Sequence, residues 1–311
     1  MNKDIIFLTP VCTHNIWGGT RLNREFGYPI EGDDIGECWG ISAHPNGDGT
    51  VASGAYKGMK LSELWEKHPE LFGDTGMDRF PLLVKIIDAK DDLSIQVHPD
   101  DAYAKAHENG SLGKTECWFI LDCKENATLV VGHNAKTKEE LEQMIHEGGW
   151  KEFIREIPIK PGDFIQIDPG TVHAIKGGTL LLETQQSSDI TYRVYDYDRL
   201  SNGKPRQLHI TQSIDVITVP AKSAENSVVH TEKKDDAIQQ LICCPYYTVY
   251  RIDVEHRVET WQDKPFVLMS VVEGEGTLNG TPLKKGDHLI LPDGYGKVEL
   301  QGRMQIIAST I

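Results

Sequence analysis

Short apolar runs bounded by glycine and proline dominate the first two thirds of the chain. Each run has the length of one β-strand and contains many β-branched or aromatic residues, and turn residues separate the runs at short intervals. This pattern favours an antiparallel β-sandwich or barrel over alternating βαβ units. The predicted strands are FPLLVKIID (80–88), LSIQVHP (93–99), CWFILDC (117–123), ATLVVGH (127–133), FIQID (164–168) and TLLLETQ (179–185).

Fewer segments show helical periodicity, so the helical portion is predicted to be small. The clearest helix lies within residues 136–156, where Thr137 and Glu140 have the spacing of a capping box. Leu141, Met144 and Ile145 follow at helical spacing. Further helices are predicted at 61–72, where Pro69 interrupts the pattern, at 100–108 and, on a weaker pattern, at 209–218.

A polar stretch without aromatic residues, 221–237, divides the chain. It is typical of a linker or excursion, and new strand-like runs follow it at 246–254, 266–272, 288–292 and 304–310. The predicted organisation is therefore a catalytic domain at 1–220, a linker or excursion at 221–237 and a smaller β domain at 238–311.

Residues 160–173 and 284–297 can be aligned as an internal repeat. Both contain a Gly-Asp turn, one strand and a glycine turn, which resembles a jelly-roll unit of the cupin kind. In this alignment Lys297 stands opposite His173, so only the first domain is expected to bind a metal at this position. The alternative is that two β-hairpins share turn residues by chance.

The acidic composition narrows the function classes. Asp and Glu number 47 against 32 Lys and Arg, giving a net charge of −15, which disfavours nucleic acids and anionic membranes as partners. No segment reaches the roughly 20 apolar residues of a membrane span, and the N-terminal apolar stretch is too short for a signal peptide. Six scattered cysteines indicate reduced thiols rather than a disulfide framework. We expect a cytoplasmic protein with no obligate protein partner.

Two pairs of alternate strand residues and one turn-borne histidine form a candidate metal site. Gln96 and His98 project to one face of a strand, as do Lys114 and Glu116, and His173 follows a Pro-Gly turn. Two imidazoles, a carboxylate and an amide suit a divalent metal, with zinc as the default. The chain has 12 histidines, however, so spacing alone leaves a chance combination open.

Two further cations indicate an anionic ligand. If 187–199 is a strand, Arg193, Tyr195 and Tyr197 share one face, while Asp196 and Asp198 share the other. This favours a polar cavity, with a solvated edge strand as the alternative. Lys85 lies within an apolar run, so it either reaches the surface or faces an anion. Together with Lys114, these cations predict a local positive site for a small anionic molecule.

An ordered set of motifs resembles type I mannose-6-phosphate isomerases (phosphomannose isomerases) of the shorter bacterial form. The resemblance covers most of residues 5–220, and the C-terminal part resembles a cupin-like domain without metal ligands. It implies two cupin-type jelly-roll β-barrels, one Zn²⁺ per chain, and interconversion of mannose 6-phosphate and fructose 6-phosphate. The motifs are IWGGT, IGECWGISAHP, FPLLVKIIDAKDDLSIQVHPDD, GKTECWFIL, PGTVHAI and ETQQSSDITYRVYDYDR.

The resemblance also implies roles for individual residues. Its zinc ligands fall on Gln96, His98, Glu116 and His173, and its active-site arginine falls on Arg193. Lys114 matches the lysine of the GKTE motif, and Ser94 and Lys85 match residues that line the substrate pocket. One departure is the helical insertion of longer members, for which only 136–156 is available here. The general base stays open among Lys114, Glu116 and a metal-bound hydroxide.

Two other functions fit a cupin fold. An iron-dependent oxygenase needs only the two histidines and the glutamate as ligands, and a non-catalytic sugar-binding module needs no turnover. Both require the ordered motif match to be accidental.

Overall fold

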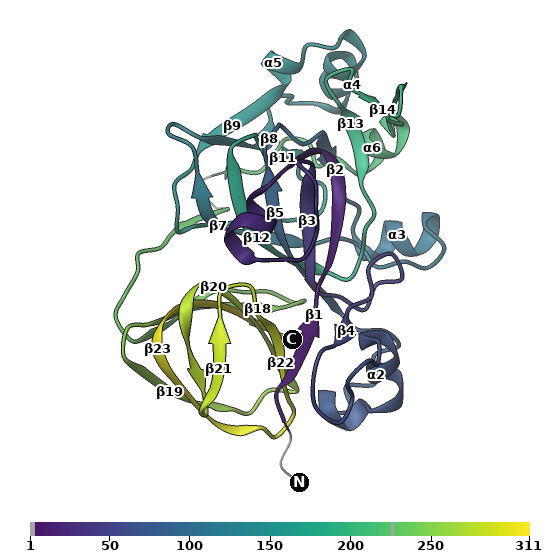
Figure 1. Ribbon diagram of the computed structural model, residues 1–311. Helices are drawn as coiled ribbons and strands as arrows, with labels where there is room; N and C mark the ends of the chain where they lie inside the picture. The colour runs from purple at the N-terminus through teal and green to yellow at the C-terminus, as the bar shows by residue number, and fades with distance from the viewer. Residues whose placement is uncertain (1–3, 225–226) are drawn as a thin grey trace.

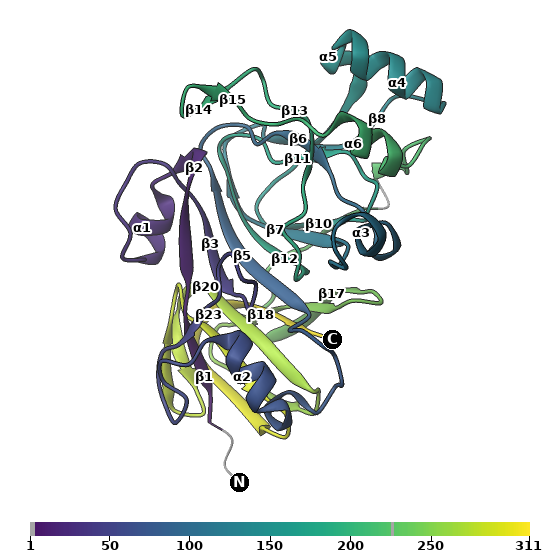
Figure 2. The same cartoon turned by 90° about the vertical axis from the view of Figure 1, so that its right-hand side faces the viewer.

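The apolar runs of the first part of the chain form strands, as predicted, in a computed structural model that describes residues 4–224 and 227–311. Figures 1 and 2 show two lobes, an N-terminal one that carries most of the helices and a C-terminal one built of strands. The prediction of a mainly β, cupin-type fold is confirmed. The six runs correspond to β5 (Leu82–Ala89), β6 (Ile95–Val97), β7 (Glu116–Cys123), β8 (Thr128–His133), β10 (Asp163–Ile167) and β12 (Thr179–Gln186).

Two sheets build the N-terminal lobe, and apolar residues of both contribute to one core. The seven-stranded sheet has the order β16-β10-β7-β12-β5-β2-β3, and the five-stranded sheet has the order β13-β6-β11-β8-β9. Trp118, Ile165 and Leu181 from the first sheet pack with Leu129 and Val131 from the second. The remaining strands of this lobe are β2 (Val11–Gly19), β3 (Ile35–Ile41), β9 (Ile154–Pro158), β11 (His173–Ala174), β13 (Tyr192–Tyr195) and β16 (Val228–His230), with a small ribbon of β14 (Leu200–Ser201) and β15 (Lys204–Pro205).

One nine-stranded sheet forms the C-terminal lobe and curves around a core of its own. Its main path is β17-β18-β23-β20-β22-β1-β4, with β19 paired to β23 and β21 to β20. The sheet paths are open, so the predicted barrels are not closed. The strands are β1 (Ile6–Thr9), β4 (Thr50–Val51), β17 (Ala237–Cys243), β18 (Thr248–Val254), β19 (Arg257–Gln262), β20 (Phe266–Leu278), β21 (Thr281–Lys284), β22 (His288–Pro292) and β23 (Gly296–Thr310).

Each lobe contains one strand or more from the part of the chain that mainly forms the other lobe or the polar stretch. Strand β1, from the start of the chain, pairs with β22 and covers an edge that would otherwise expose its backbone N–H and C=O groups. Conversely β16, within the polar stretch 221–237, pairs with β10 of the first lobe. The predicted division at 220 and 238 misses both exchanges, because edge pairing between distant segments leaves no periodic signal in either segment.

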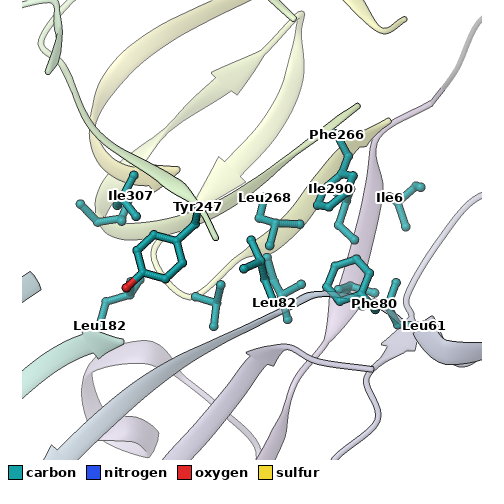
Figure 3. Packing of buried hydrophobic residues seen from close by; sticks show 14 of the residues in the cluster. Ile6, Leu61, Phe80, Leu82, Leu182, Tyr247, Phe266, Leu268, Ile290 and Ile307 are labelled. Carbon is teal, nitrogen blue, oxygen red and sulfur yellow. The ribbon is translucent and has the colours of Figure 1, made fainter. Parts of the chain in front are cut away.

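An apolar cluster joins the two lobes. Phe80 and Leu82 from the first lobe pack with Phe266, Leu268 and Ile290 from the second, and Figure 3 shows their side chains meeting between the ribbons. All five are buried. A fused core of this kind predicts that the lobes unfold together.

The helices lie where the sequence predicts them, with one addition. Thr137 accepts a hydrogen bond from the backbone N–H of Glu140, and Pro69 begins a separate 3₁₀ turn. No helix among the described residues is both long and apolar enough to cross a bilayer. The helices are α1 (Arg21–Phe26), which was not predicted, α2 (Leu61–Lys67), η1 (Pro69–Phe72), α3 (Asp101–His107), α4 (Lys138–Glu147), α5 (Trp150–Phe153) and α6 (Ile210–Val216).

A buried histidine also holds the lobes together. Nε2 of His288 lies 2.7 Å from the hydroxyl of Tyr28 in the other lobe, and Nδ1 lies 2.8 Å from the hydroxyl of Ser270. A side chain at Gly40 would collide with the imidazole, since a Cβ there would lie 2.2 Å from Cε1. Burial lowers the pKa of His288 to about 3.

This contact predicts a pH dependence of stability. The folded state holds His288 neutral, so its contribution is complete above the unfolded pKa of about 6.5 and is lost as the pH falls from there toward 3. We expect the free energy of unfolding to fall by at most about 1.4 kcal/mol per pH unit from this group. Urea unfolding at pH 8, 6 and 5 checks this against His288→Gln, which removes the titration. The prediction is contradicted if the difference in free energy of unfolding between the two proteins stays the same at all three pH values.

Candidate metal centre

Three buried side chains converge between the two sheets of the N-terminal lobe. Nε2 of His98 lies 3.1 Å from Nε2 of His173, and these nitrogens lie 3.4 and 3.3 Å from the two carboxylate oxygens of Glu116. One potential ligand atom from each residue lies within 4.8 Å of the others. Among the residues that the structure describes, no other group of three His, Cys, Asp or Glu side chains meets this criterion.

Strand register explains this convergence. In the five-stranded sheet, His173 of β11 pairs with Gln96 of β6, and Gln96 pairs with Arg193 of β13. Paired residues on neighbouring strands project to the same face, so these three side chains form one row. Glu116 comes from the facing seven-stranded sheet, where it opens β7 opposite Ile167. His98 lies one residue beyond the end of β6, and its Nε2 is 3.1 Å from that of His173.

Nε2 of both imidazoles faces the centre, and a hydrogen bond fixes the tautomer of His173. Nδ1 of His173 lies 2.9 Å from the carbonyl oxygen of Thr171 and donates to it, which leaves Nε2 unprotonated and facing Glu116. Burial, followed by the nearby Lys114 ammonium, lowers the pKa of His98 to about 3, and burial also lowers the pKa of His173. Neutral imidazoles are the form that binds metals.

Glu116 is ionised, and the Lys114 ammonium lies 2.9 Å from its Oε2. Burial alone would raise its pKa, but Lys114, His98 and His173 outweigh that effect and hold it well below its ordinary value. Both oxygens are fully buried, and Lys114 faces Oε2 alone, so Oε1 has no donor among the described residues. A buried carboxylate oxygen without a donor is costly unless a cation meets it. The donor set therefore fits a divalent metal.

Gln96 and Ser94 lie at the edge of this cluster. The amide nitrogen of Gln96 lies 3.2 Å from Nε2 of His173, and its oxygen accepts a hydrogen bond of 3.4 Å from the hydroxyl of Ser94. A half turn of the amide would present the oxygen to the centre instead. Ser94 is buried.

Lys114 and Lys85 both face carboxylates. Lys114 lies 2.9 Å from Oε2 of Glu116; burial works to lower its pKa, but that carboxylate raises it above its ordinary value. Lys85 lies 3.6 Å from Glu37 and 3.7 Å from Glu183, too far for hydrogen bonds. Its ammonium donates no hydrogen bond to a described residue.

The two carboxylates beside Lys85 were not singled out from the sequence. The indole N–H of Trp39 donates to Glu37 at 2.7 Å, and that of Trp118 donates to Glu183 at 3.1 Å. An acidic residue within a buried strand is the signal that could have found Glu183, which lies in TLLLETQ.

The interior is not the positive site that the sequence predicted. Two lysines, 85 and 114, face three carboxylates, on residues 37, 116 and 183. With Arg193, the third cation of the predicted site, the formal charges sum to zero, because Glu37 and Glu183 lie on strands that the sequence pattern could not place beside Lys85. A divalent cation would change this sum to two positive charges.

Arg193 is the cation without a counter-ion. It makes no ion pair among the described residues, and its Nη1 donates to the carbonyl oxygen of Gln207 at 2.8 Å. As predicted, Asp196 does not neutralise it; instead Asp196 pairs with Arg199 at 2.6 Å and Arg206 at 2.5 Å. Burial, followed by the charge of Arg206, lowers the pKa of Arg193.

The predicted common face of Arg193, Tyr195 and Tyr197 is wrong. The register shifts between Arg193 and Tyr195, which is a β-bulge, and Tyr195 stacks on Trp150 with ring centroids 4.5 Å apart. Strand β13 ends at Tyr195, and Tyr197 adopts a positive φ of 56°. Arg199 and Arg206 both pair with Asp196 in this region, and Arg206 was not found from the sequence.

A cupin-type β-fold with a buried His₂Glu centre is the class that these observations define. Residues 5–120 match the catalytic domain of type I phosphomannose isomerase, and residues 237–311 match the cupin domain of mannose-6-phosphate isomerase. The chain belongs to the type I phosphomannose isomerase family, which confirms the predicted family and its enzymatic class.

Individual relatives align over the whole chain. Mannose-6-phosphate isomerase ManA of Bacillus subtilis is 51% identical, over 99% of both chains. Mannose-6-phosphate isomerase of Streptococcus mutans is 48% identical, over 98% of this chain and 97% of that one. A crystal structure of mannose 6-phosphate isomerase from Bacillus subtilis superposes with a TM-score of 0.93 at 49% identity, covering 99% of this chain and 100% of that one.

Proposed function

We propose that this enzyme interconverts mannose 6-phosphate and fructose 6-phosphate at the His98–Glu116–His173 centre, with one zinc ion held there. The convergence of these ligand atoms within 4.8 Å, in a chain of this family, carries the proposal. Two neutral imidazole nitrogens and a carboxylate are ordinary zinc ligands, and Gln96 with its amide turned, or water, completes four. Family membership argues against the oxygenase and the non-catalytic binding module.

The metal would supply Lewis-acid polarisation of a substrate oxygen. Isomerisation of an aldose to a ketose moves a proton between C1 and C2 through an enediol, so negative charge develops on an oxygen. Arg193 is uncompensated and lies in the same row as His173, which makes it a suitable partner for that charge. Lys114, held as an ammonium by Glu116, adds a second cation beside the same centre.

Substrate binding is assigned to Lys85 and Ser94. The ammonium of Lys85 lies beyond hydrogen-bond reach of both neighbouring carboxylates, so its donors stay available for a substrate oxygen. Ser94 is fixed beside Gln96. Contacts remote from the reacting carbons position them for the reaction. In this proposal the segment 1–220 carries the chemistry, and 238–311 provides stability and shielding.

Removing the metal tests the proposal directly. A coupled assay for fructose 6-phosphate formed from mannose 6-phosphate should show turnover that a chelator abolishes and added Zn²⁺ restores, since the Lewis acid of the proposal is the metal and not a side chain. Elemental analysis of the untreated enzyme should give one zinc per chain. Turnover that persists after measured loss of all metal would refute the role of the centre.

A further inference from the structure

The two lobes repeat one strand order. In the N-terminal lobe the order is β3-β5-β12-β7-β10, and in the C-terminal lobe it is β17-β18-β23-β20-β22. The pairing β11–β6 in the first lobe corresponds to the pairing of the start of β23 with β19 in the second. The internal repeat detected in the sequence is therefore part of a larger repeat of strand order, and register matches positions of the metal centre to positions in the C-terminal lobe.

Register identifies the counterpart of Glu116. Glu116 pairs with Ile167, and the repeat places Ile167 at Leu291, which pairs with Val267. Ile167 and Leu291 both belong to the core of their lobe, so the faces agree. Val267 therefore stands where Glu116 stands.

Two more charged positions are neutral in the second lobe. Glu183 of β12 pairs with Trp118 on one side and Lys85 on the other. At the corresponding place in β23, Ala308 pairs with Met269 and with Tyr250. Alanine and tyrosine thus replace Glu183 and Lys85.

The sequence alignment matched His173 with Lys297, but the structure matches it with Val298. Lys297 points outward, 3.1 Å from the exposed Glu259, whereas Val298 is buried in the lobe core. The turn before this strand is one residue longer than in the first lobe, so the residue on the inner face is Val298 and not Lys297. Val298 pairs with Thr260, which therefore replaces Gln96.

All five counterparts line a single cavity of about 250 Å³. Ile252, Met269 and Leu291 also contribute to its wall. Two large apolar side chains on its lining are open to solvent, Trp261 at 66% and Ile238 at 41% exposure. The C-terminal lobe has therefore kept a pocket at the place of the metal centre, with uncharged side chains at the positions of Lys85, Gln96, Glu116, His173 and Glu183. The five counterparts are Tyr250, Thr260, Val267, Val298 and Ala308.

We propose that this cavity is a second ligand site, which binds one small uncharged aromatic molecule. The five counterparts carry no charge, and the two charged residues on the lining, Asp263 and Lys264, have side chains that are 68% and 49% exposed. A sugar phosphate or a metal ion inside the cavity would therefore lose its hydration without compensation. The exposed ring of Trp261 provides a stacking surface at the solvent side. A dry apolar cavity of about 150 Å³ binds benzene, so a cavity of this volume accommodates a ring system as large as indole.

Indole titrated into the whole enzyme by isothermal titration calorimetry tests the proposal. Saturable binding at one site per chain is expected, both in the presence and in the absence of saturating mannose 6-phosphate. Val267→Phe fills the cavity and should weaken binding at least about tenfold while leaving isomerase activity unchanged. Leu200→Ala, which removes an apolar side chain of 59% exposure from the other lobe, should bind indole as the parent enzyme does.

Trp261→Ala gives an independent test, because truncating so exposed a side chain leaves the core intact; it should weaken binding several-fold. The proposal is overturned if indole shows no saturable binding up to its solubility, or if mannose 6-phosphate displaces it. It is equally overturned if a folded Val267→Phe variant or the Trp261→Ala variant binds indole as tightly as the parent enzyme.

Discussion

Replacing His173 with alanine is expected to strip the metal and abolish turnover. The imidazole is fully buried, its Nδ1 is committed to the carbonyl oxygen of Thr171, and its Nε2 faces Glu116 at 3.3 Å. No other described side chain can take its place at that point. The loss of activity should exceed about 10³-fold, the upper end for removing a single oxyanion-stabilising donor, because a missing ligand removes the cation as well.

Metal content and activity have to be measured on the same protein. Elemental analysis of His173→Ala should give zinc well below one equivalent, while circular dichroism verifies that the sheets have formed. His256→Ala is the matched control, since its side chain is 81% exposed and lies in the other lobe. It should keep both zinc and activity. Full zinc occupancy in a folded His173→Ala enzyme would remove His173 from the ligand set.

Local spacing predicted one part of this centre well. Gln96 and His98, or Lys114 and Glu116, lie two residues apart, and a strand sends alternate residues to one face regardless of the rest of the fold. A separate argument, the cost of burying an unpaired charge, indicated that Lys85 within its apolar run either reaches the surface or faces an anion. Both inferences depend only on residues within one short segment, so the sequence is sufficient for them.

The counter-ions of Lys85 could not be predicted in the same way. Glu37 comes from β3 and Glu183 from β12, on either side of β5, and neither has a local pattern that marks it as a partner. The bulge after Arg193 also has no local signal, yet it changes which face Tyr195 occupies. Similarly, one extra residue in a turn moved Val298 into the position that the alignment gave to Lys297. Errors of one residue matter in a strand, because they exchange its inner and outer faces.

Arg193→Ala is expected to lower kcat by about 10²–10³ and to change KM little. Its guanidinium lies in the same row as Gln96 and His173 and has no ion-pair partner among the described residues. An uncompensated, half-buried cation is costly unless an anion meets it. The enediolate supplies that charge only as the reaction proceeds, which is the condition for lowering the barrier rather than strengthening ground-state binding.

Steady-state kinetics of three variants separate this role from phosphate binding. Arg193→Lys should recover only part of kcat, because an ammonium lacks the planar fork of donors. Arg303→Ala, with a side chain 79% exposed in the other lobe, is the matched control and should be unchanged. Lys85→Ala should chiefly raise KM, since its free donors are assigned to substrate binding. If Arg193→Ala instead raises KM strongly with kcat intact, while Lys85→Ala lowers kcat, the two assignments are interchanged, and Arg193 belongs with Arg199 and Arg206 as an anchor for the phosphate.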